Sequence, residues 1–258
     1  MPRFAANTSF LFTEAPFLER FEAARRSGFG AVEFHFPYAS SPAEVAAAAK
    51  GAGAQVVLFN LPAGHWEQGE RGIACHPDRV VEFRDGVARA IEYARALECP
   101  RVNCLAGIAP GDADPDRVSA TFVDNLRHAA DALAGEGVEL VIEPLNTRSI
   151  PDFYLDTTAQ ALDIIREVGS ANLKIQYDIF HMQIMEGDLA KTIESALPHI
   201  GHIQFADVPD RHEPGTGEVN FEFLFDWIDR IGYGGWIGAE YLPARRTSDT
   251  LGWLEKYR

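Results

Sequence analysis

The amino-acid sequence predicts an α/β protein, a single (β/α)8 barrel that occupies residues 1–258 as one domain. Short apolar runs alternate with longer amphipathic segments along the chain, which gives eight strand-then-helix units in 258 residues. Such a barrel routinely has this length, and the 47% of hydrophobic residues can form a sizeable core. No low-complexity linker divides the units. No Gly-rich dinucleotide-binding turn follows the first strand, which disfavours an open doubly wound sheet.

The first half of the chain supplies four units. Strands are expected at residues 4–10, 31–36, 55–60 and 101–106, with helices at residues 17–27, 42–52, 80–97 and 116–135. In the first helix, Phe17, Phe21 and Ala24 have helical spacing, and Gly28 marks its end. A long polar loop separates the third strand from its helix.

The second half supplies the other four units. Strands are expected at residues 139–144, 173–178, 200–207 and 236–241, with helices at residues 157–168, 182–197, 221–231 and 247–256. Asp156 or Thr157 is suited to cap the first of these helices. A Pro/Gly-rich loop follows the seventh strand.

Polar residues stand at or near the C-terminal ends of these last four strands, where apolar residues are the norm. They are Glu143, Asp178, Gln204 and Glu240, spaced by about one strand-helix unit each. Active sites of (β/α)8 barrels form at this end of the strands, so we expect the four side chains to share one part of the mouth. In the eighth strand, Gly238 leaves space beneath Glu240.

A bound divalent cation explains why four polar side chains occur at matching strand ends better than coincidence does. Three carboxylates so close together repel one another unless a cation neutralises them, and oxygen ligands suit Mg²⁺ or Mn²⁺. A single strand-end Glu is more often a solvated or loop-capping residue, so the prediction depends on all four. Gln204 is the weakest member, because its amide can equally be a donor, and Asp207 is an alternative ligand.

The net charge and the cysteine content narrow the range of possible functions and cellular locations. The net charge is −15 and the pI about 4.9, which disfavours binding to nucleic acid or anionic membranes. Cys75, Cys99 and Cys104 form no metal-binding or disulfide pattern, and we expect them to be structural in a reducing compartment. No apolar run has the length of a signal peptide or membrane span, so we expect a cytoplasmic protein.

The segments that carry the polar residues resemble the metal-site strands of the xylose isomerase-like TIM barrels: IEPLN (142–146), IQYDIFHM (175–182) and HIQFAD (202–207). Within that group, the chain is similar to the hydroxypyruvate isomerase family through FNLPAG (59–64), GERGIAC (69–75), FRDGV (83–87), RHEPGTGE (211–218) and GWIGAEY (235–241). The 2-oxo-tetronate isomerase family shares MPRFAAN (1–7) and PDRHEP (209–214). The likeness runs nearly end to end. Leu242 departs from it, since both families commonly have a Lys there.

The resemblance implies interconversion of hydroxypyruvate and 2-hydroxy-3-oxopropanoate (tartronate semialdehyde). It implies that Glu143 and Glu240 are the acid–base pair and that Glu143, Asp178, Gln204 and Glu240 bind the metal. A proton leaves one carbon and returns to its neighbour through an enediolate, and a metal would stabilise the developing charge. Which carboxylate removes the proton stays open.

Other residues are expected to bind the substrate, which is a small keto or sugar acid. Arg71 and Arg211 are candidates for its carboxylate, because Arg binds carboxylates bidentately, although either can equally be a solvated surface charge. His181 is a candidate to donate to a substrate oxygen or to orient a ligand. Glu70 and Asn103 are further candidates to face the mouth.

Four alternative functions stay open at this point. A 2-oxo-tetronate isomerase or a ketose 3-epimerase would use the same scaffold. An endonuclease IV-like metal phosphodiesterase would need several zinc ions and a His-rich mouth, which the carboxylate-rich mouth disfavours. A non-catalytic sugar-acid binding protein would not need two acid–base carboxylates. A homodimer is also expected.

Overall fold

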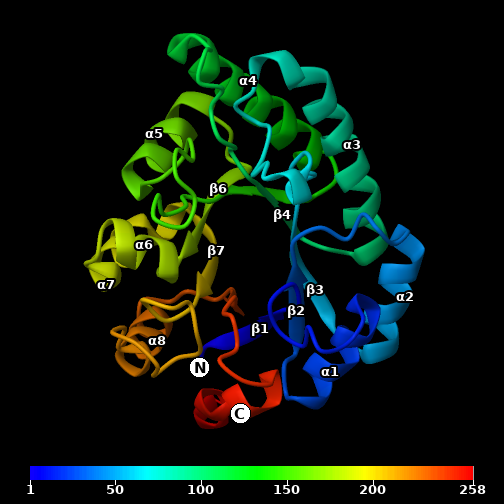
Figure 1. Cartoon of the computed structure of the whole chain (residues 1–258), viewed down its shortest axis with the longest axis vertical. Helices are drawn as coiled ribbons and strands as arrows, with labels where there is room; N and C mark the ends of the chain where they lie inside the picture. The colour runs from blue at the N-terminus through cyan, green and yellow to red at the C-terminus, as the bar shows by residue number, and fades with distance from the viewer. Residues whose placement is uncertain (258) are drawn as a thin grey trace.

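The computed structural model describes residues 1–257 and forms a closed barrel of eight parallel strands in chain order (Figure 1), which confirms the predicted fold class. The barrel closes where β8 pairs with β1, with Ala5 opposite Gly238. The strands are β1 (Arg3–Asn7), β2 (Ala31–Phe34), β3 (Gln55–Asn60), β4 (Arg101–Cys104), β5 (Glu139–Ile142), β6 (Leu173–Asp178), β7 (Ile200–Phe205) and β8 (Trp236–Ala239).

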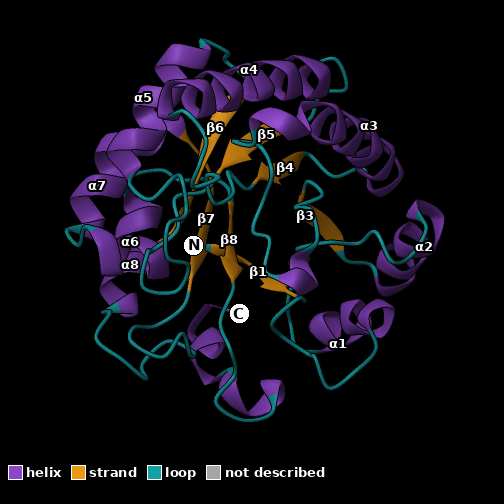
Figure 2. Ribbon diagram, turned by 45° about the horizontal axis from the view of Figure 1, so that its top comes forward, coloured by secondary structure: helices purple, strands orange, loops and turns teal. Residues whose placement is uncertain are grey.

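Helices surround the barrel (Figure 2). They are α1 (Arg20–Arg26), α2 (Pro42–Ala52), α3 (Val80–Leu97), α4 (Pro115–Ala134), α5 (Thr158–Val168), α6 (Ile179–Met185), α7 (Leu189–Ala196) and α8 (Phe221–Arg230). Local signals explain several of their bounds. Ser41 and Glu44 form a reciprocal capping box at α2, which ends at Gly53 in the left-handed conformation. Thr157 caps α5 by accepting from the Gln160 N–H. Within residues 1–257, no helix combines the length and apolarity needed to span a bilayer.

Five strands, β2, β4, β5, β7 and β8, end two residues earlier than predicted, and three predicted elements differ more. The expected helix 182–197 is two helices, α6 and α7, because Gly187 and Asp188 between them have positive φ angles of 68° and 42°. The expected helix 247–256 is two short 3-10 segments, Thr247–Thr250 and Gly252–Tyr257. The first strand ends at Asn7 instead of residue 10, because the N–H of Leu11 turns back to the Asn7 carbonyl.

The barrel interior changes character along its axis. Near the N-terminal ends of the strands, Ala5, Ala31 and Val57 form a small apolar cluster against Trp236. Above this cluster the interior is polar, with Glu33 and His202 joined across the barrel from β2 and β7. The large aromatic residues pack instead between strands and helices, as Phe205 and Phe225 do. The apolar core therefore lies outside the barrel, and a polar interior leads to the mouth.

Candidate active site

The four predicted strand-end residues lie at one end of the barrel, and all are buried. Asp178 ends β6 and Gln204 lies in β7, while Glu143 and Glu240 directly follow β5 and β8. Contacts join them: the Gln204 Nε2 donates to the Glu240 Oε2 at 2.6 Å, and Arg211 lies between Asp178 and Glu240. The structure thus brings together all four residues that the strand-end pattern singled out.

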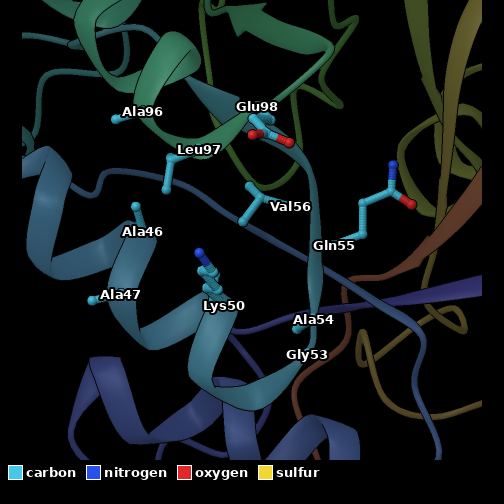
Figure 3. A pocket seen from close by; sticks show the side chains of 11 residues that line it. Ala46, Ala47, Lys50, Gly53, Ala54, Gln55, Val56, Ala96, Leu97 and Glu98 are labelled. Atoms are coloured by element: carbon cyan, nitrogen blue, oxygen red, sulfur yellow. The ribbon is translucent and has the colours of Figure 1, made fainter.

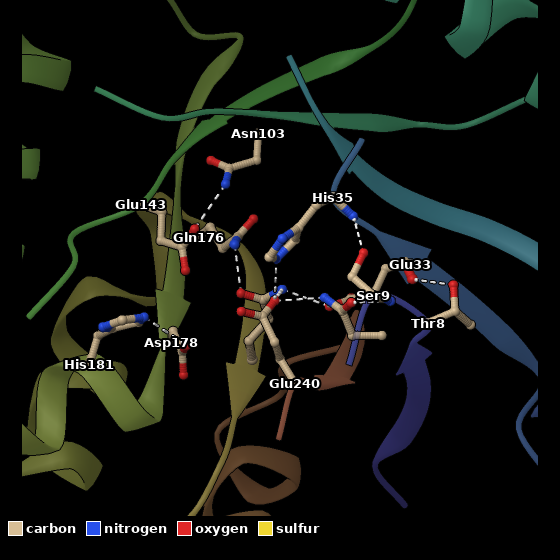
Figure 4. Close-up of polar contacts among 12 residues, drawn as sticks. Thr8, Ser9, Glu33, His35, Asn103, Glu143, Gln176, Asp178, His181 and Glu240 are labelled. Atoms are coloured by element: carbon tan, nitrogen blue, oxygen red, sulfur yellow. Dashed lines mark hydrogen bonds and ion pairs between the residues drawn. The ribbon is translucent and has the colours of Figure 1, made fainter. Parts of the chain in front are cut away.

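Glu143, Asp178 and His181 form a tight buried cluster (Figure 4). Each offers a ligand atom, and these atoms all lie within 4.8 Å of one another. His181 Nε2 is 3.5 Å from Asp178 Oδ2, and its Nδ1 accepts the N–H of Asn146 at 3.0 Å. A neutral His181 therefore carries its proton on Nε2, on the side of Asp178. Asn103, a predicted mouth residue, donates to Glu143 at 2.9 Å.

The electrostatics of this cluster leave negative charge poorly compensated. Burial, reinforced by Glu240 and Asp178, raises the pKa of Glu143 well above its usual value. Burial likewise raises the pKa of Asp178 to about 7, although Arg211 opposes the shift. Burial also holds the pKa of His181 well below normal, with Arg211 adding to the effect. A cation between these groups would remove the repulsion, as ionic partners do for crowded carboxylates.

Glu240 lies in a different environment. Burial alone would raise its pKa, but His35 and Arg211 outweigh burial and hold the pKa below its usual value. His35 Nε2 is 3.6 Å from Glu240 Oε2, and its side chain is 20% exposed, so it reaches the open side of the mouth (Figure 4). The two proposed acid–base carboxylates, Glu143 and Glu240, thus have opposite pKa shifts.

Arg211 is the cation nearest to these carboxylates in the described chain. Its guanidinium is 2.5 Å from Glu240 Oε1 and 3.4 Å from Asp178 Oδ2. It also lies over the rings of Phe10 and Phe180, each 4.9 Å from the guanidinium carbon. Arg211 has a φ of 60°, a backbone conformation that the loop after β7 holds in place.

Asp207 organises that loop and is not available as a metal ligand. Its two carboxylate oxygens accept five backbone N–H groups, those of Val208, Gly215, Thr216, Gly217 and Val219. The Asp207 carbonyl also accepts the N–H of Arg211 at 2.9 Å. These bonds disfavour the alternative in which Asp207 replaces Gln204, because its oxygens are already used within the loop.

Gln204 has a donor arrangement at the site. Its Oε1 accepts from Gln176 at 2.6 Å, and its Nε2 donates to both Glu33 and Glu240 at 2.6 Å. To ligate a cation, its oxygen would have to leave Gln176. The carboxylates of Glu143 and Asp178 could hold a divalent cation with Glu240 next to them, whereas His181 could join them only through an Nε2 that has lost its proton.

The structure places Glu70 and Arg71 in the loop between β3 and α3. Glu70 accepts from Arg79 at 2.7 Å and from the His65 N–H at 2.5 Å. Arg71 stacks on Trp66 at 4.2 Å and donates to backbone carbonyls of the same loop. Between residues 1 and 257, no recorded contact joins Glu70 or Arg71 to the strand-end carboxylates. Trp66 itself lies 6.0 Å from the His35 ring, so Arg71 stands at the rim.

Three residues of the site were missed from the sequence: Asn7, Glu33 and His35. Asn7 donates to Glu240 at 2.6 Å, and Glu33 accepts from Gln204. A usable signal was present, because Glu33 and His35 share one face of the second strand by two-residue alternation. An acidic residue inside an otherwise apolar strand is unusual enough to suggest a role.

A separate hollow of about 730 Å³ lies beside α2 and β3 (Figure 3). Ala46, Lys50, Gln55 and Glu98 are among its lining residues. Gln55 is the first residue of β3, so the hollow lies at the end of the barrel opposite the carboxylates. It contains none of the side chains described above and is not the catalytic site.

Comparisons with known proteins agree with this geometry. The xylose isomerase-like TIM barrel model matches residues 21–257. The chain is 51% identical to a hydroxypyruvate isomerase of Escherichia coli over 100% of both chains. It is 48% identical to a 2-oxo-tetronate isomerase of Cupriavidus necator, over 100% of this chain and 99% of the relative.

A solved structure from Brucella melitensis, described as an AP endonuclease of family 2, matches with a TM-score of 0.97 and 44% identity over 100% of both chains. The two isomerases, which this chain matches at full length, confirm the expectation that it is an isomerase. Since the family model covers all but the first 20 residues and the final one, the chain belongs to the family of xylose isomerase-like TIM barrels.

Proposed function

We propose that this chain interconverts hydroxypyruvate and tartronate semialdehyde. The observation that carries the proposal is a pair of buried carboxylates, Glu143 and Glu240, beside a third carboxylate and a guanidinium at one barrel mouth. An aldose–ketose type isomerisation needs two groups that exchange protons and a positive charge for the substrate oxygens. The E. coli relative named for this reaction supports the choice of substrate.

In the proposed reaction, one of Glu143 and Glu240 takes a proton from the CH₂OH carbon of hydroxypyruvate. The neighbouring ketone oxygen gains negative charge, and an enediolate forms. The other carboxylate returns a proton to the former ketone carbon, while the hydroxyl proton moves between the two oxygens. Atoms and charge balance, because the product is an isomer of the substrate.

Other residues would bind and orient the substrate. Arg211 is the best candidate for the substrate carboxylate, because its guanidinium lies between Phe10 and Phe180 at the mouth. His181 would present its Nε2–H to a substrate oxygen from beside Asp178. A bound Mg²⁺ or Mn²⁺ would supply the charge that stabilises the enediolate, and Glu143, Asp178, Gln204 and Glu240 would hold it.

The test is an NMR assay of hydroxypyruvate in D₂O with the purified protein, before and after EDTA treatment and after addition of Mg²⁺ or Mn²⁺. We expect conversion with deuterium incorporation, lost with EDTA and restored by the metal. The variants Glu143→Gln and Glu240→Gln should each lose at least about 10²-fold in kcat. Glu139→Gln, at the other end of β5, serves as the control. Full activity in either Gln variant at the mouth would contradict the two-carboxylate mechanism.

A four-carbon 2-oxo acid is the second candidate substrate, favoured by the 48% identity to the C. necator 2-oxo-tetronate isomerase. The same assay with 2-oxo-tetronate decides between them by the ratio of kcat/KM values. A ketose 3-epimerase would act on a free ketose in that assay. The phosphodiesterase alternative, which the description of the B. melitensis structure brings back, predicts binding to damaged duplex DNA at modest salt. The net charge of −15 argues against it.

Five further expectations belong to the same proposal. The chain would work as a single domain, in the cytoplasm, without nucleic-acid or membrane partners. It would form a homodimer, which sedimentation measures directly. Arg71 and Glu70 would contribute to substrate binding from the rim if their loop moves toward the mouth.

A further inference from the structure

A layer of polar side chains lies inside the barrel directly beneath the proposed catalytic carboxylates. Glu33, Asn7, His202 and Gln204 belong to it, and none of them has any exposed surface. Interiors of (β/α)8 barrels are usually filled by branched apolar residues. A buried carboxylate is costly unless it is hydrogen-bonded, so the presence of Glu33 at this depth needs an explanation.

Three donors converge on Glu33. Asn7 Nδ2 lies 3.1 Å and Gln204 Nε2 lies 2.6 Å from its Oε1, while His202 Nε2 lies 2.6 Å from its Oε2. His202 Nδ1 has no hydrogen-bond partner in the described part of the chain. His202 therefore carries its proton on Nε2 and donates it to Glu33.

Two of these donors also bind Glu240. Asn7 Nδ2 and Gln204 Nε2 each lie 2.6 Å from the Glu240 Oε2. Neither amide can turn freely, because Asn7 Oδ1 accepts the N–H of Ser9 and Gln204 Oε1 accepts from Gln176. Glu33 and Glu240 thus share two oriented amide groups, one carboxylate below and one at the mouth.

The backbone of β8 reserves space for Glu33. A Cβ atom on Gly238 would lie 2.3 Å and 2.4 Å from the two carboxylate oxygens of Glu33. The space left by the absent side chain of Gly238 thus accommodates the Glu33 carboxylate. The sequence pattern had predicted only that Gly238 leaves space beneath Glu240. This packing observation is independent of the hydrogen bonds, and it indicates the same position for the Glu33 carboxylate as they do.

From these contacts we infer that Glu33 is a positioning residue: it holds Asn7 and Gln204 so that both amides fix the Glu240 carboxylate at the mouth. The inference rests on the proposed function, in which Glu240 transfers a proton. Displacement of a reacting group by about 1 Å costs on the order of 10²-fold in rate. Loss of Glu33 should therefore lower kcat, whereas KM should change little because Glu33 has no exposed surface.

The test compares Glu33→Leu and Glu33→Gln with Glu139→Leu, which removes a carboxylate paired with Arg101 at the far end of the barrel. We expect Glu33→Leu to lose about 10²-fold in kcat with KM within threefold. Glu33→Gln should recover most of the activity. Its amide oxygen can accept from Asn7 and Gln204, and its N–H can donate to His202 Nε2 if the His202 proton moves to Nδ1. Glu139→Leu should keep its kcat.

Crystal structures of the same variants test the inference without any substrate. In Glu33→Leu, the Glu240 carboxylate should leave the position where Asn7 and Gln204 reach it. Wild-type protein that does not act on hydroxypyruvate would remove the proposed function and leave this structural test intact. Wild-type kcat in Glu33→Leu, or an unmoved Glu240, would overturn the inference. If Glu33→Leu does not fold, Glu33→Asp takes its place, since the shorter side chain withdraws the carboxylate from both amides. An unchanged kcat in Glu33→Asp would overturn the inference equally.

Discussion

Substitution of Gly238 by Ala probes the polar interior from the opposite side. The new Cβ would lie 2.3 Å from one oxygen of Glu33, and contacts under 3.0 Å are essentially never seen for a Cβ atom. The Glu33 carboxylate would have to withdraw by about 1 Å to reach ordinary van der Waals contact. That movement would weaken its bonds to Asn7, Gln204 and His202, which are 3.1, 2.6 and 2.6 Å long.

The expected magnitudes follow from this displacement. Overpacking typically costs about 1–3 kcal/mol of unfolding free energy. Misplacement of Glu240 through its shared amides should lower kcat by about 10²-fold. Urea unfolding and the NMR isomerase assay measure the two effects. Gly234→Ala is the matched control, because a Cβ there meets nothing within 4 Å. If Gly238→Ala keeps wild-type stability and kcat, the rigid packing of Glu33 against β8 does not exist.

Three other predictions concern charge. In cation-free protein the pKa of Asp178 is raised from 3.8 to about 7, so the folded state binds more protons than the unfolded state in this range. The unfolding free energy of the protein should therefore fall by up to about 4 kcal/mol between about pH 4 and pH 7. Mn²⁺ at 100 times its Kd should add about 2.7 kcal/mol to it. Urea titrations with and without Mn²⁺ measure both effects, and an unfolding free energy that rises with pH would refute the first. Arg211→Met should reduce kcat/KM by at least about 10²-fold and Arg71→Met by less than about tenfold, since of these two only Arg211 contacts the carboxylates. Steady-state kinetics measure both values, and a larger loss in Arg71→Met than in Arg211→Met would contradict this. Burial raises the pKa of Cys75 to about 12, so a thiol reagent at pH 8 should label it only after unfolding.

Much of the site could be predicted because a parallel barrel imposes a simple rule. All strands end at one rim, so Glu143, Asp178, Gln204 and Glu240 had to meet there once the strands were recognised. The same rule placed His181 correctly, directly after β6. The strand pattern needs only local sequence periodicity, which is strong in this chain.

The rest depends on contacts that no local pattern contains. Glu33 and His202 come from β2 and β7, which β1 and β8 separate, and alternation says only that each faces inward. The role of Asp207 could not be read either, because its five N–H partners gather only when the loop after β7 folds back. The break between α6 and α7 was visible in principle, since a Gly precedes an Asp at residues 187–188, but helical spacing on both sides concealed it.

The charges at the mouth form a balance that explains why Arg211 belongs to the site. Without a cation, its guanidinium lies between Asp178 and Glu240 and compensates two of the three buried carboxylates. Within residues 1–257 no guanidinium is paired with Glu143, and burial raises its pKa well above the usual value. A divalent cation would compensate all three carboxylates and weaken the hold of Asp178 and Glu240 on Arg211. The guanidinium would then be free to bind a substrate carboxylate, and metal binding would favour substrate binding through one side chain.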